Sequence, residues 1–310
     1  MRKPGIDVSF VMTVFNKEYY LPSVLKALLG QTGIKNPEYI FVDDVSHDRS
    51  VDIIRKATKN IPNVTIIVNK TRMGISPNTN KALKLAKGKY VRMLDSDDIL
   101  PINSTEKMVA LAELHNADIV YGCFEKTGLE PEKLTNRMMG DFKYTYCKDA
   151  LEGLLNGRFI RMGQLISNHV LQKAKGADER VFIQDQSLPL RAAIHAHGII
   201  KIAENAVLIP KEIGNFSGNK LQLDHDRFLA YAYALTDNPA LPLKCRLKMQ
   251  RRAFSAYWKM VRKTRTFPYF DKGLKFYLWS RIAQSIDLQT LEAMRQEFLA
   301  LPGVRRIGDK

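Results

Sequence analysis

The sequence predicts an α/β fold in which a mostly parallel sheet carries helices on both faces, followed by a basic, mainly helical C-terminal appendage. Two observations predict the sheet. Short runs of β-branched and aromatic residues alternate with amphipathic segments through the first 125 residues, and these runs are almost continuously apolar, as strands buried on both faces are. A third observation predicts the appendage: most of the excess positive charge lies in one late segment of helical character.

The predicted strands and helices alternate along the chain. The strands are Val8–Val14, Tyr39–Val42, Val64–Val68, Tyr90–Leu94 and Ile119–Tyr121. The helices are Leu21–Leu29, Ser50–Asn60, Pro77–Ala86 and Asn103–Asn116. In open α/β sheets, ligands bind beyond the carboxyl ends of the strands. Polar residues follow the ends of the first three strands: Thr13, Asn16, Asp43, Asp44 and Asn69.

Length and composition fit one large domain, or a domain with an appendage. The chain has 310 residues, of which 45% are hydrophobic, and this is enough to form a proper core. Residues 1–7 lack the apolar stretch of a secretion signal, and no run is long enough to cross a bilayer, so we expect a cytoplasmic protein. Cys123, Cys147 and Cys245 show no paired spacing, which predicts reduced thiols rather than disulfides or a zinc site.

The most informative motif is Asp95-Ser96-Asp97-Asp98, which follows the fourth predicted strand. Three carboxylates this close repel one another unless a cation or a hydrogen-bonding ligand lies among them, and such oxygen ligands suit Mg²⁺ or Mn²⁺. The motif therefore predicts a metal–diphosphate site. The alternative is an Asp-rich turn that caps the helix expected to begin near Asn103.

Five segments together resemble the family 2 glycosyltransferases of GT-A fold. They are Val8–Lys17, Tyr39–Asp48, Asn69–Asn80, Gly88–Asp98 and Gly176–Arg191, and they occur in the usual order of that family over about two-thirds of the chain. The resemblance implies an inverting enzyme that uses a nucleotide-sugar donor, with UDP-sugars favoured. The remaining third resembles no family we can name.

The resemblance implies a donor site at the strand ends. It assigns Asp44 to the nucleotide base, and a carboxylate can accept a hydrogen bond from an imide N–H. The other implied nucleotide-sugar contacts are Thr13, Phe15, Asn80, Asp95 and Ser96. Structural alternatives exist: an aromatic after a strand can belong to the core, and Asp43 and Asp44 can shape a turn or cap the next helix, although Asp48 suits that capping role better.

The resemblance also implies a Mn²⁺ or Mg²⁺ cofactor, which Asp97 coordinates directly and Asp95 helps to hold. Cleaving a sugar–diphosphate bond leaves negative charge on the departing oxygens, and a divalent cation neutralises that charge.

Asp185 is the predicted catalytic base. An inverting transfer needs a group that takes the proton from the acceptor hydroxyl, and Asp185 matches the second acid of a Glu-Asp pair in the family. The first acid is Gln184 here, and a neutral neighbour does not raise the pKa of Asp185 as a carboxylate would. The structural alternative is that Asp185 is a helix N-cap.

Two further positions depart from the family pattern. Thr79 stands where an arginine is common, so that Lys81 or Arg72 would have to supply the positive charge, unless both are simply solvated. The stretch 210–220 lacks the histidine that often approaches the diphosphate. Polar candidates in that stretch are Asn215, Ser217 and Lys220.

The segment from Leu241 to Arg281 holds twelve basic residues against the single acid Asp271, a net charge of +11 out of +16 for the chain. Nine aromatic residues are interleaved with them, and a helical pattern breaks near Pro268. Basic helices with aromatics are typical of contact with an anionic membrane surface, here the inner face of the membrane. The alternatives are a phosphate-rich acceptor, or a helical appendage whose aromatics pack inward; nucleic acid is the least favoured partner.

These observations predict a catalytic domain over residues 1–220, with a donor half to about residue 125 and an acceptor half over 126–220, and a basic helical region over 221–310. The predicted function is metal-dependent sugar transfer to a hydroxyl of a glycan or lipid-linked acceptor in bacterial-type surface polysaccharide or lipopolysaccharide assembly. Two alternatives remain open: a nucleotide-sugar-fold protein that binds a polyanion without catalysis, and a nucleotidyltransferase.

Overall fold

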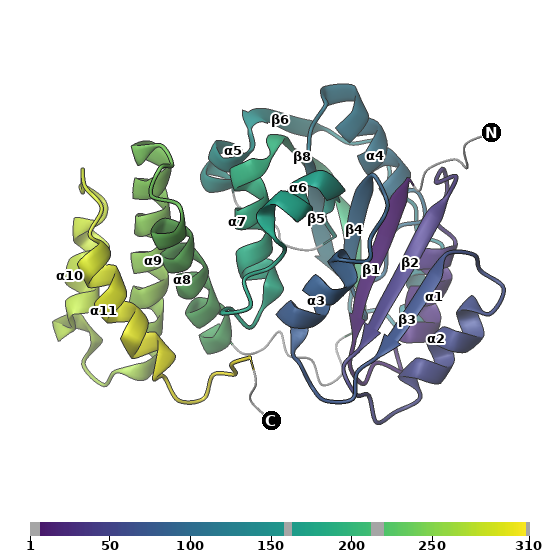
Figure 1. The fold of residues 1–310 in the computed structure, drawn as a ribbon, viewed down its shortest axis with the longest axis horizontal. Coiled ribbons are helices and arrows are strands. Elements are labelled where there is room, and N and C mark those ends of the chain that lie inside the picture. The colour runs from purple at the N-terminus through teal and green to yellow at the C-terminus, as the bar shows by residue number, and fades with distance from the viewer. Residues whose placement is uncertain (1–6, 158–162, 212–219, 308–310) are drawn as a thin grey trace.

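The strands form one mixed sheet at the centre of the molecule (Figure 1). The computed structural model describes residues 7–157, 163–211 and 220–307. The strands are β1 Val8–Val14, β2 Pro37–Asp43, β3 Val64–Val68, β4 Tyr90–Asp95, β5 Ile119–Lys126, β6 Tyr144–Asp149, β7 Leu165–Ser167 and β8 His197–Ile209. Among these residues the sheet has eight strands in the order β3-β2-β1-β4-β7-β5-β8-β6.

The prediction of a mostly parallel sheet is confirmed. Strands β3, β2, β1 and β4 pair in parallel, and so do β5 and β8. The exceptions are β7, which runs antiparallel between β4 and β5, and β6, which runs antiparallel to β8. The five strands expected from the sequence all occur, with β2, β4 and β5 longer than predicted.

Seven helices precede the C-terminal region in the described chain. They are α1 Leu21–Leu29, α2 Ser50–Thr58, α3 Ile75–Leu83, α4 Ser104–His115, α5 Ala150–Asn156, α6 Asn168–Ala174 and α7 Gln184–His195. The largest difference from the predicted bounds is at α3, which begins two residues before Pro77. A proline is tolerated in the first turn of a helix because the N–H it lacks has no partner there, so Pro77 does not mark the start.

Alternation along β1 divides the core between the two faces of the sheet. Phe10 and Met12 belong to one hydrophobic cluster with residues of α1, α2 and α4. Val11 belongs to a second cluster with residues of α3, α5, α6 and α7. Because successive side chains of a strand point to opposite faces, an apolar strand such as β1 supports both helical layers at once.

The C-terminal region is a group of helices that packs beside α5 and α7 (Figure 1). Its helices are α8 Lys220–Asp237, α9 Leu243–Thr264, α10 Lys272–Trp279 and α11 Leu288–Leu299, with a 3₁₀ turn at Pro268–Phe270. The predicted helical appendage and its break near Pro268 are confirmed. Phe254 and Tyr257 of α9 lie in the same hydrophobic cluster as Val11 of β1. The predicted boundary between a catalytic domain and a C-terminal region at residue 220 stays an interpretation.

Most of the large aromatics of α9 face inward. Phe254, Tyr257 and Trp258 are buried and pack against rings of α10 and α11. These three agree with the inward-packing alternative, whereas the aromatics of the turn after α9 are exposed. In the part of the chain that the structure describes, no helix has the length and apolarity to span a bilayer, and the three cysteines form no disulfide.

Candidate active site

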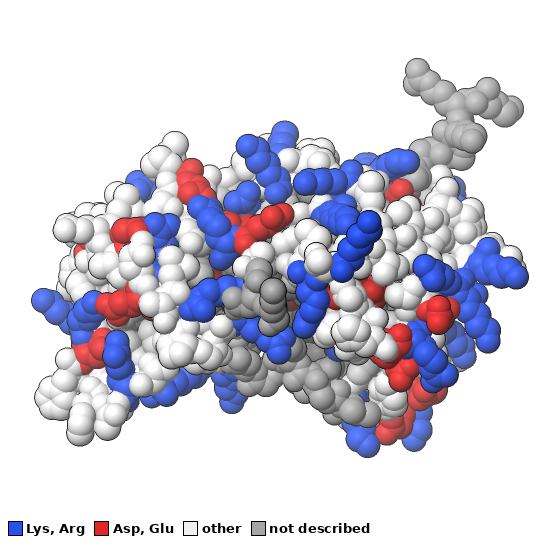
Figure 2. All heavy atoms as spheres, turned by 60° about the horizontal axis from the view of Figure 1, so that its bottom comes forward, with Lys and Arg blue, Asp and Glu red and all other residues white. Residues whose placement is uncertain are grey.

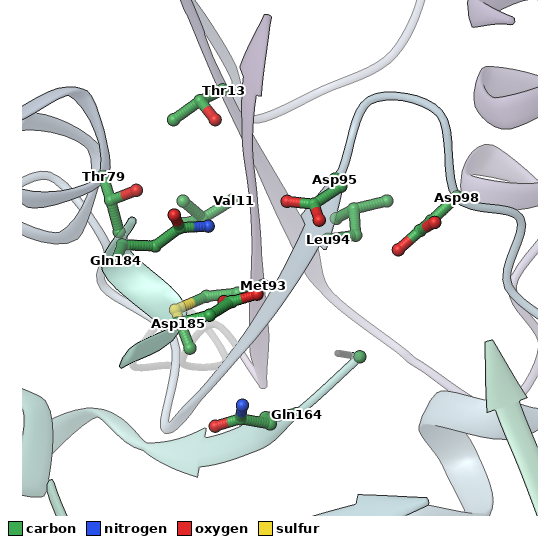
Figure 3. A pocket seen from close by; sticks show the side chains of 11 residues that line it. Val11, Thr13, Thr79, Met93, Leu94, Asp95, Asp98, Gln164, Gln184 and Asp185 are labelled. Carbon is green, nitrogen blue, oxygen red and sulfur yellow. The ribbon is translucent and has the colours of Figure 1, made fainter. Parts of the chain in front are cut away.

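A pocket lies where β1 and β4 end and α7 begins. The register of the parallel strands brings their carboxyl ends together. Thr13 of β1 pairs with Asp95 of β4, and Val14 of β1 pairs with Asp43 of β2. The lining residues are Val11, Thr13, Thr79, Met93, Leu94, Asp95, Asp98, Gly163, Gln164, Gln184 and Asp185. Figure 3 shows Gln184 and Asp185 on one side of this pocket and Asp95 and Asp98 on the other. The structure thus brings together the two acidic groups that the sequence separates by about ninety residues.

Asp95 and Asp98 place two carboxylates on one side of the pocket, and Asp97 lies between them in the sequence without lining it. Burial and the neighbouring Asp97 raise the pKa of Asp95 to about 6, although Lys17 acts in the opposite direction. Burial has the largest effect on the pKa of Asp98 and raises it. The negative charges of Asp95, Asp97 and Asp185 raise it further. The Oδ2 atom of Asp98 has no hydrogen-bond partner among the described residues. The carboxylates therefore repel one another and would gain from a cation.

Among the residues that the structure describes, the basic side chain paired with the acidic motif is Lys17, just after β1. Its Nζ atom is 2.5 Å from Asp97 Oδ2, and both side chains are about one-fifth exposed. The motif does not cap α4. That helix begins at Ser104, its N-cap residue is Asn103, and no side chain bonds to its first N–H groups. The side chain of Asn103 instead bonds to the backbone of Met139. The capping alternative for the acidic motif is wrong.

The donor set fits a hard divalent ion, although it does not form a complete site. Among the residues with described placement, no three His, Cys, Asp or Glu side chains converge as metal ligands. Asp95 and Asp97 offer carboxylate oxygens, which are the ligand type that Mg²⁺ and Mn²⁺ prefer. A metal held here would need further oxygens from a ligand such as a diphosphate, together with water.

The raised pKa of Asp95 predicts a pH effect on stability. Because the folded pKa of about 6 lies above the ordinary 3.8, the contribution of this group to stability is full below about pH 4 and is lost as pH rises through 6. We expect Asp95→Asn, which mimics the protonated form, to gain stability relative to metal-free wild type between pH 4.5 and 7. Urea unfolding of both proteins across this range measures the difference. A difference that does not change with pH would contradict the assignment.

Asp185 lies on the opposite side of the pocket, in the first turn of α7. The helix begins at Gln184 and its N-cap is Ile183, so the alternative that Asp185 is an N-cap is wrong. Asp185 is half-buried, and Gln184 beside it is buried, with an Oε1 atom that has no hydrogen-bond partner among the described residues. This end of α7 thus brings a carboxylate and a side-chain amide to the pocket (Figure 3).

Asp44 is buried at the end of β2 and organises the loop that leads into α3. Its carboxylate accepts hydrogen bonds from the N–H groups of Met73 (2.8 Å) and Gly74 (3.0 Å), and from Asn69 Nδ2 (3.2 Å). Burial acts to raise the pKa of Asp44, but these hydrogen bonds outweigh it and hold the pKa below its ordinary value. The contact with a nucleotide base stays a prediction, and it would have to share a carboxylate that already has three donors.

Arg72 and Phe15 form a stacked pair beside Asp44. The guanidinium carbon of Arg72 is 3.8 Å from the centre of the Phe15 ring, and its Nε atom is 4.0 Å from Asp44 Oδ2. The pair is exposed enough to contact a ligand, since Arg72 is exposed and Phe15 half-buried. Asp43 makes local bonds to Ser46, in agreement with the turn alternative. Asp48 accepts a hydrogen bond from the N–H of Ser50, but the N-cap of α2 is Arg49, so Asp48 is not the cap of that helix.

Asn80 joins α3 to the segment before α7. Its side chain donates to Ala177 O (2.9 Å) and Glu179 Oε1 (2.8 Å) and accepts from Ala177 N (2.7 Å). Its predicted role in donor binding stays a prediction, as does that of Ser96, which is buried and does not line the pocket. Thr79 does line the pocket, whereas Lys81 donates to Asn69 Oδ1. Asn215 and Ser217 lie outside the described residues.

We expect Asn80→Ala to destabilise the fold by about 2 to 4 kcal/mol, because it leaves the buried N–H and C=O of Ala177 without their partner. The matched control is Asn60→Ala, at an exposed position, which should have little effect. Urea unfolding measures both. A stable Asn80→Ala protein that loses only donor affinity would show that Asn80 serves the ligand rather than the fold.

Sequence patterns missed two residues beside the acidic cluster and the base. Lys17 could have been found, because it is the first cation after β1 and that strand ends beside β4. Gln164 lines the pocket just before β7, a strand of three residues that gives no periodic signal.

Comparisons with known proteins agree with this architecture. The model of the family described as glycosyl transferase family 2 matches residues 9–171. This range exceeds half of the chain and includes the acidic cluster. The chain belongs to glycosyl transferase family 2.

Curated relatives share this part of the chain. The minor teichoic acid biosynthesis protein GgaB of Bacillus subtilis is 32% identical over 114 residues, which are 36% of this chain and 13% of GgaB. The glycosyltransferase GlyG of Streptococcus pneumoniae is 23% identical over 73% of this chain and 78% of its own length. The poly(ribitol-phosphate) beta-glucosyltransferase of Bacillus spizizenii is 34% identical over 38% of this chain and 19% of its own length.

Solved structures share the fold over nearly the whole chain. The S. aureus TarS fragment 1–349 in complex with UDP-GlcNAc has a TM-score of 0.67 at 16% identity, over 95% of this chain and 92% of that one. The mannosyltransferase PcManGT of Pyrobaculum calidifontis, in complex with GDP-Man and Mn²⁺, has a TM-score of 0.59 at 15% identity, over 97% of this chain and 85% of that one. The predicted GT-A fold is confirmed.

Proposed function

We propose that the protein is an inverting glycosyltransferase that moves a sugar from a nucleotide-diphosphate sugar to a hydroxyl group of a glycan or lipid-linked acceptor. The observation that carries this proposal is the placement of Asp185 across one pocket from Asp95 and Asp98 (Figure 3). A direct displacement needs a base on one side of the sugar and stabilisation of the leaving group on the other; we propose Asp185 for the first and a cation held by the acidic motif for the second.

The base is Asp185 in this proposal. Its carboxylate takes the proton from the acceptor hydroxyl while the hydroxyl oxygen attacks the anomeric carbon, and the bond from that carbon to the diphosphate breaks on the side of the acidic cluster. Gln184, which lines the pocket next to the base, adds a neutral amide there. Attack from the face opposite the leaving group inverts the anomeric centre.

Asp95 and Asp97 are the residues that would hold Mn²⁺ or Mg²⁺, beside the proposed position of the donor diphosphate. When bound, such an ion neutralises the charge that develops on the leaving oxygens. Lys17, which is paired with Asp97, provides a positive charge on this side of the site and would be available to a diphosphate. Arg72 and Phe15 are proposed to flank the nucleotide base of the donor at the end of β2.

The names of similar proteins support the choice of substrates. TarS binds UDP-GlcNAc and PcManGT binds GDP-Man with Mn²⁺, and GgaB and the Bacillus spizizenii enzyme act in teichoic acid or poly(ribitol-phosphate) chemistry. We propose a UDP-sugar donor and an acceptor of the surface-polysaccharide class. We also propose that the enzyme works on the inner face of the membrane, where the basic segment 241–281 meets anionic lipid.

Donor hydrolysis tests this function directly. With Mn²⁺ and a panel of nucleotide sugars, we expect one donor both to raise the melting temperature and to release free sugar slowly, since glycosyltransferases commonly transfer some sugar to water. Chelation with EDTA should stop the release. If a donor binds and yet no sugar is released with metal and acceptor present, the protein is a binder and the catalytic proposal fails.

A further inference from the structure

The turn between α9 and α10 exposes three aromatic side chains. Phe267 is 74% exposed, Tyr269 71% and Phe270 93%, although α9 beside them buries its own large aromatics. Large apolar side chains scattered singly on a surface are ordinary, but three within four residues form a local apolar projection. We call Phe267, Tyr269 and Phe270 the aromatic tip.

The backbone of the aromatic tip is held in place. The N–H of Phe270 bonds to the carbonyl of Phe267, and Asp271 closes the turn by accepting from the N–H of Gly273 at the start of α10 (2.7 Å). Tyr269 also packs edge-on against Trp258 of α9, with 6.0 Å between ring centres. The rings are therefore presented by a defined turn between two helices and not by a loose segment.

Basic residues of α9 and α10 flank the aromatic tip in the sequence. Lys259, Arg262 and Lys275 are exposed and make no ion pair with any residue that the structure describes. Arg265 is 3.7 Å from Asp271, which is the single acid between residues 241 and 281. Aromatic rings beside uncompensated cations match the chemistry of an anionic bilayer surface, where rings settle at the level of the lipid headgroups and cations pair with lipid phosphates.

We propose that the aromatic tip inserts into the headgroup region of an anionic phospholipid bilayer, with Lys259, Arg262 and Lys275 contacting the lipid phosphates. This proposal specifies the membrane contact of the enzyme proposed above, but its test needs no turnover. The proposed membrane contact is therefore limited to one turn and three basic residues of the segment 241–281, because most other aromatics of the segment are wholly or partly buried.

The position of the aromatic tip suits an enzyme that takes its acceptor from the membrane. The turn between α9 and α10 lies on the side of the molecule to which the carboxyl ends of β1, β2 and β4 point, the lower side in Figure 1. Figure 2 turns that side toward the viewer and shows blue side chains along it, with an uncharged lobe at the helical end. A bilayer that contacts this side would lie near the end of the sheet that carries the pocket.

Vesicle flotation of the full chain tests the proposal. The probes are phosphatidylcholine vesicles with and without about 30% phosphatidylglycerol. We expect wild type to float with the anionic vesicles at low salt and less at 1 M salt, since the Debye length falls to about 3 Å there. The triple variant Phe267→Ser, Tyr269→Ser, Phe270→Ser should lose on the order of tenfold in partition coefficient. Because all three side chains are exposed, its melting temperature should stay close to that of wild type.

Two matched variants complete the experiment. Leu114→Ser with Met138→Ser removes side chains that are 72% and 66% exposed elsewhere, and this control should float like wild type. The second is the triple variant Lys259→Gln, Arg262→Gln, Lys275→Gln. It should lose the salt-sensitive part of binding to anionic vesicles.

Three results would overturn the proposal. The first is a triple Ser variant that floats as well as wild type. The second is wild type that stays in the aqueous fraction with anionic vesicles. The third is a triple variant that converts a lipid-free dimer to a monomer, which would make the tip a contact between two copies of the chain.

Discussion

Asp185→Asn is expected to lower the rate of sugar transfer by about 10²- to 10⁴-fold while nucleotide-sugar affinity stays close to that of wild type. The substitution keeps the size of the side chain and removes its ability to take a proton. Asp185 lies in the first turn of α7, where a negative charge favours the helix, so a stability loss of up to about 1 kcal/mol is expected as well. Initial rates with saturating donor and acceptor, together with donor binding by calorimetry, separate the two effects.

The matched control for this variant is Asp52→Asn, at a surface position on α2 whose side chain is 80% exposed. It should transfer sugar at the wild-type rate. If Asp185→Asn also does so, the proton acceptor is a different group and the assignment of the base is wrong. A pH–rate profile adds a second readout, since the low-pH limb of wild type should be absent from the residual activity of the variant.

Asp97→Ala is expected to abolish transfer and leave the fold intact. The side chain is about one-fifth exposed and pairs with Lys17, so its loss should lower the melting temperature only slightly. Its proposed role is to hold the ion that neutralises the leaving diphosphate, and without that ion the leaving group is poor. Turnover measured over a Mn²⁺ titration checks the expectation, with the melting temperature of the variant as evidence of folding.

The control for the metal assignment is Asp141→Ala, which removes a fully exposed carboxylate outside the pocket. It should keep the wild-type dependence on Mn²⁺. Wild-type turnover by Asp97→Ala at ordinary Mn²⁺ or Mg²⁺ concentrations would defeat the assignment of Asp97. Transfer that recovers only at much higher metal concentrations would instead agree with a weakened metal site.

The first half of the sheet could be predicted from the sequence because its strands are apolar on both faces. Val8–Val14 and Val64–Val68 match β1 and β3 residue for residue, as Leu21–Leu29 matches α1. The antiparallel strand β7 could not be predicted, since three residues carry no period. Its position between β4 and β5 depends on contacts between residues that are far apart in the sequence.

The candidate site was predictable where a carboxylate follows a strand and less so where side chains come from different segments. Asp95, Asp98 and Asp185 meet at one pocket, whereas Asp97, the predicted direct metal ligand, does not line it. The hydrogen bonds of Asp44 to Met73 and Gly74 were not foreseen, because they depend on how the loop before α3 folds back. The exposure of Phe267, Tyr269 and Phe270 could not be separated from the burial of Phe254 and Tyr257, since all five belong to one basic, aromatic stretch.

A crystal structure with Mn²⁺ and the nucleotide sugar that raises the melting temperature most would test the central claim directly. We predict an anomalous manganese peak between a carboxylate oxygen of Asp97 and the diphosphate oxygens, with the anomeric carbon between that ion and Asp185. A structure in which Lys17 still holds Asp97, and the nucleotide binds elsewhere or no manganese is found in the pocket, would contradict the account.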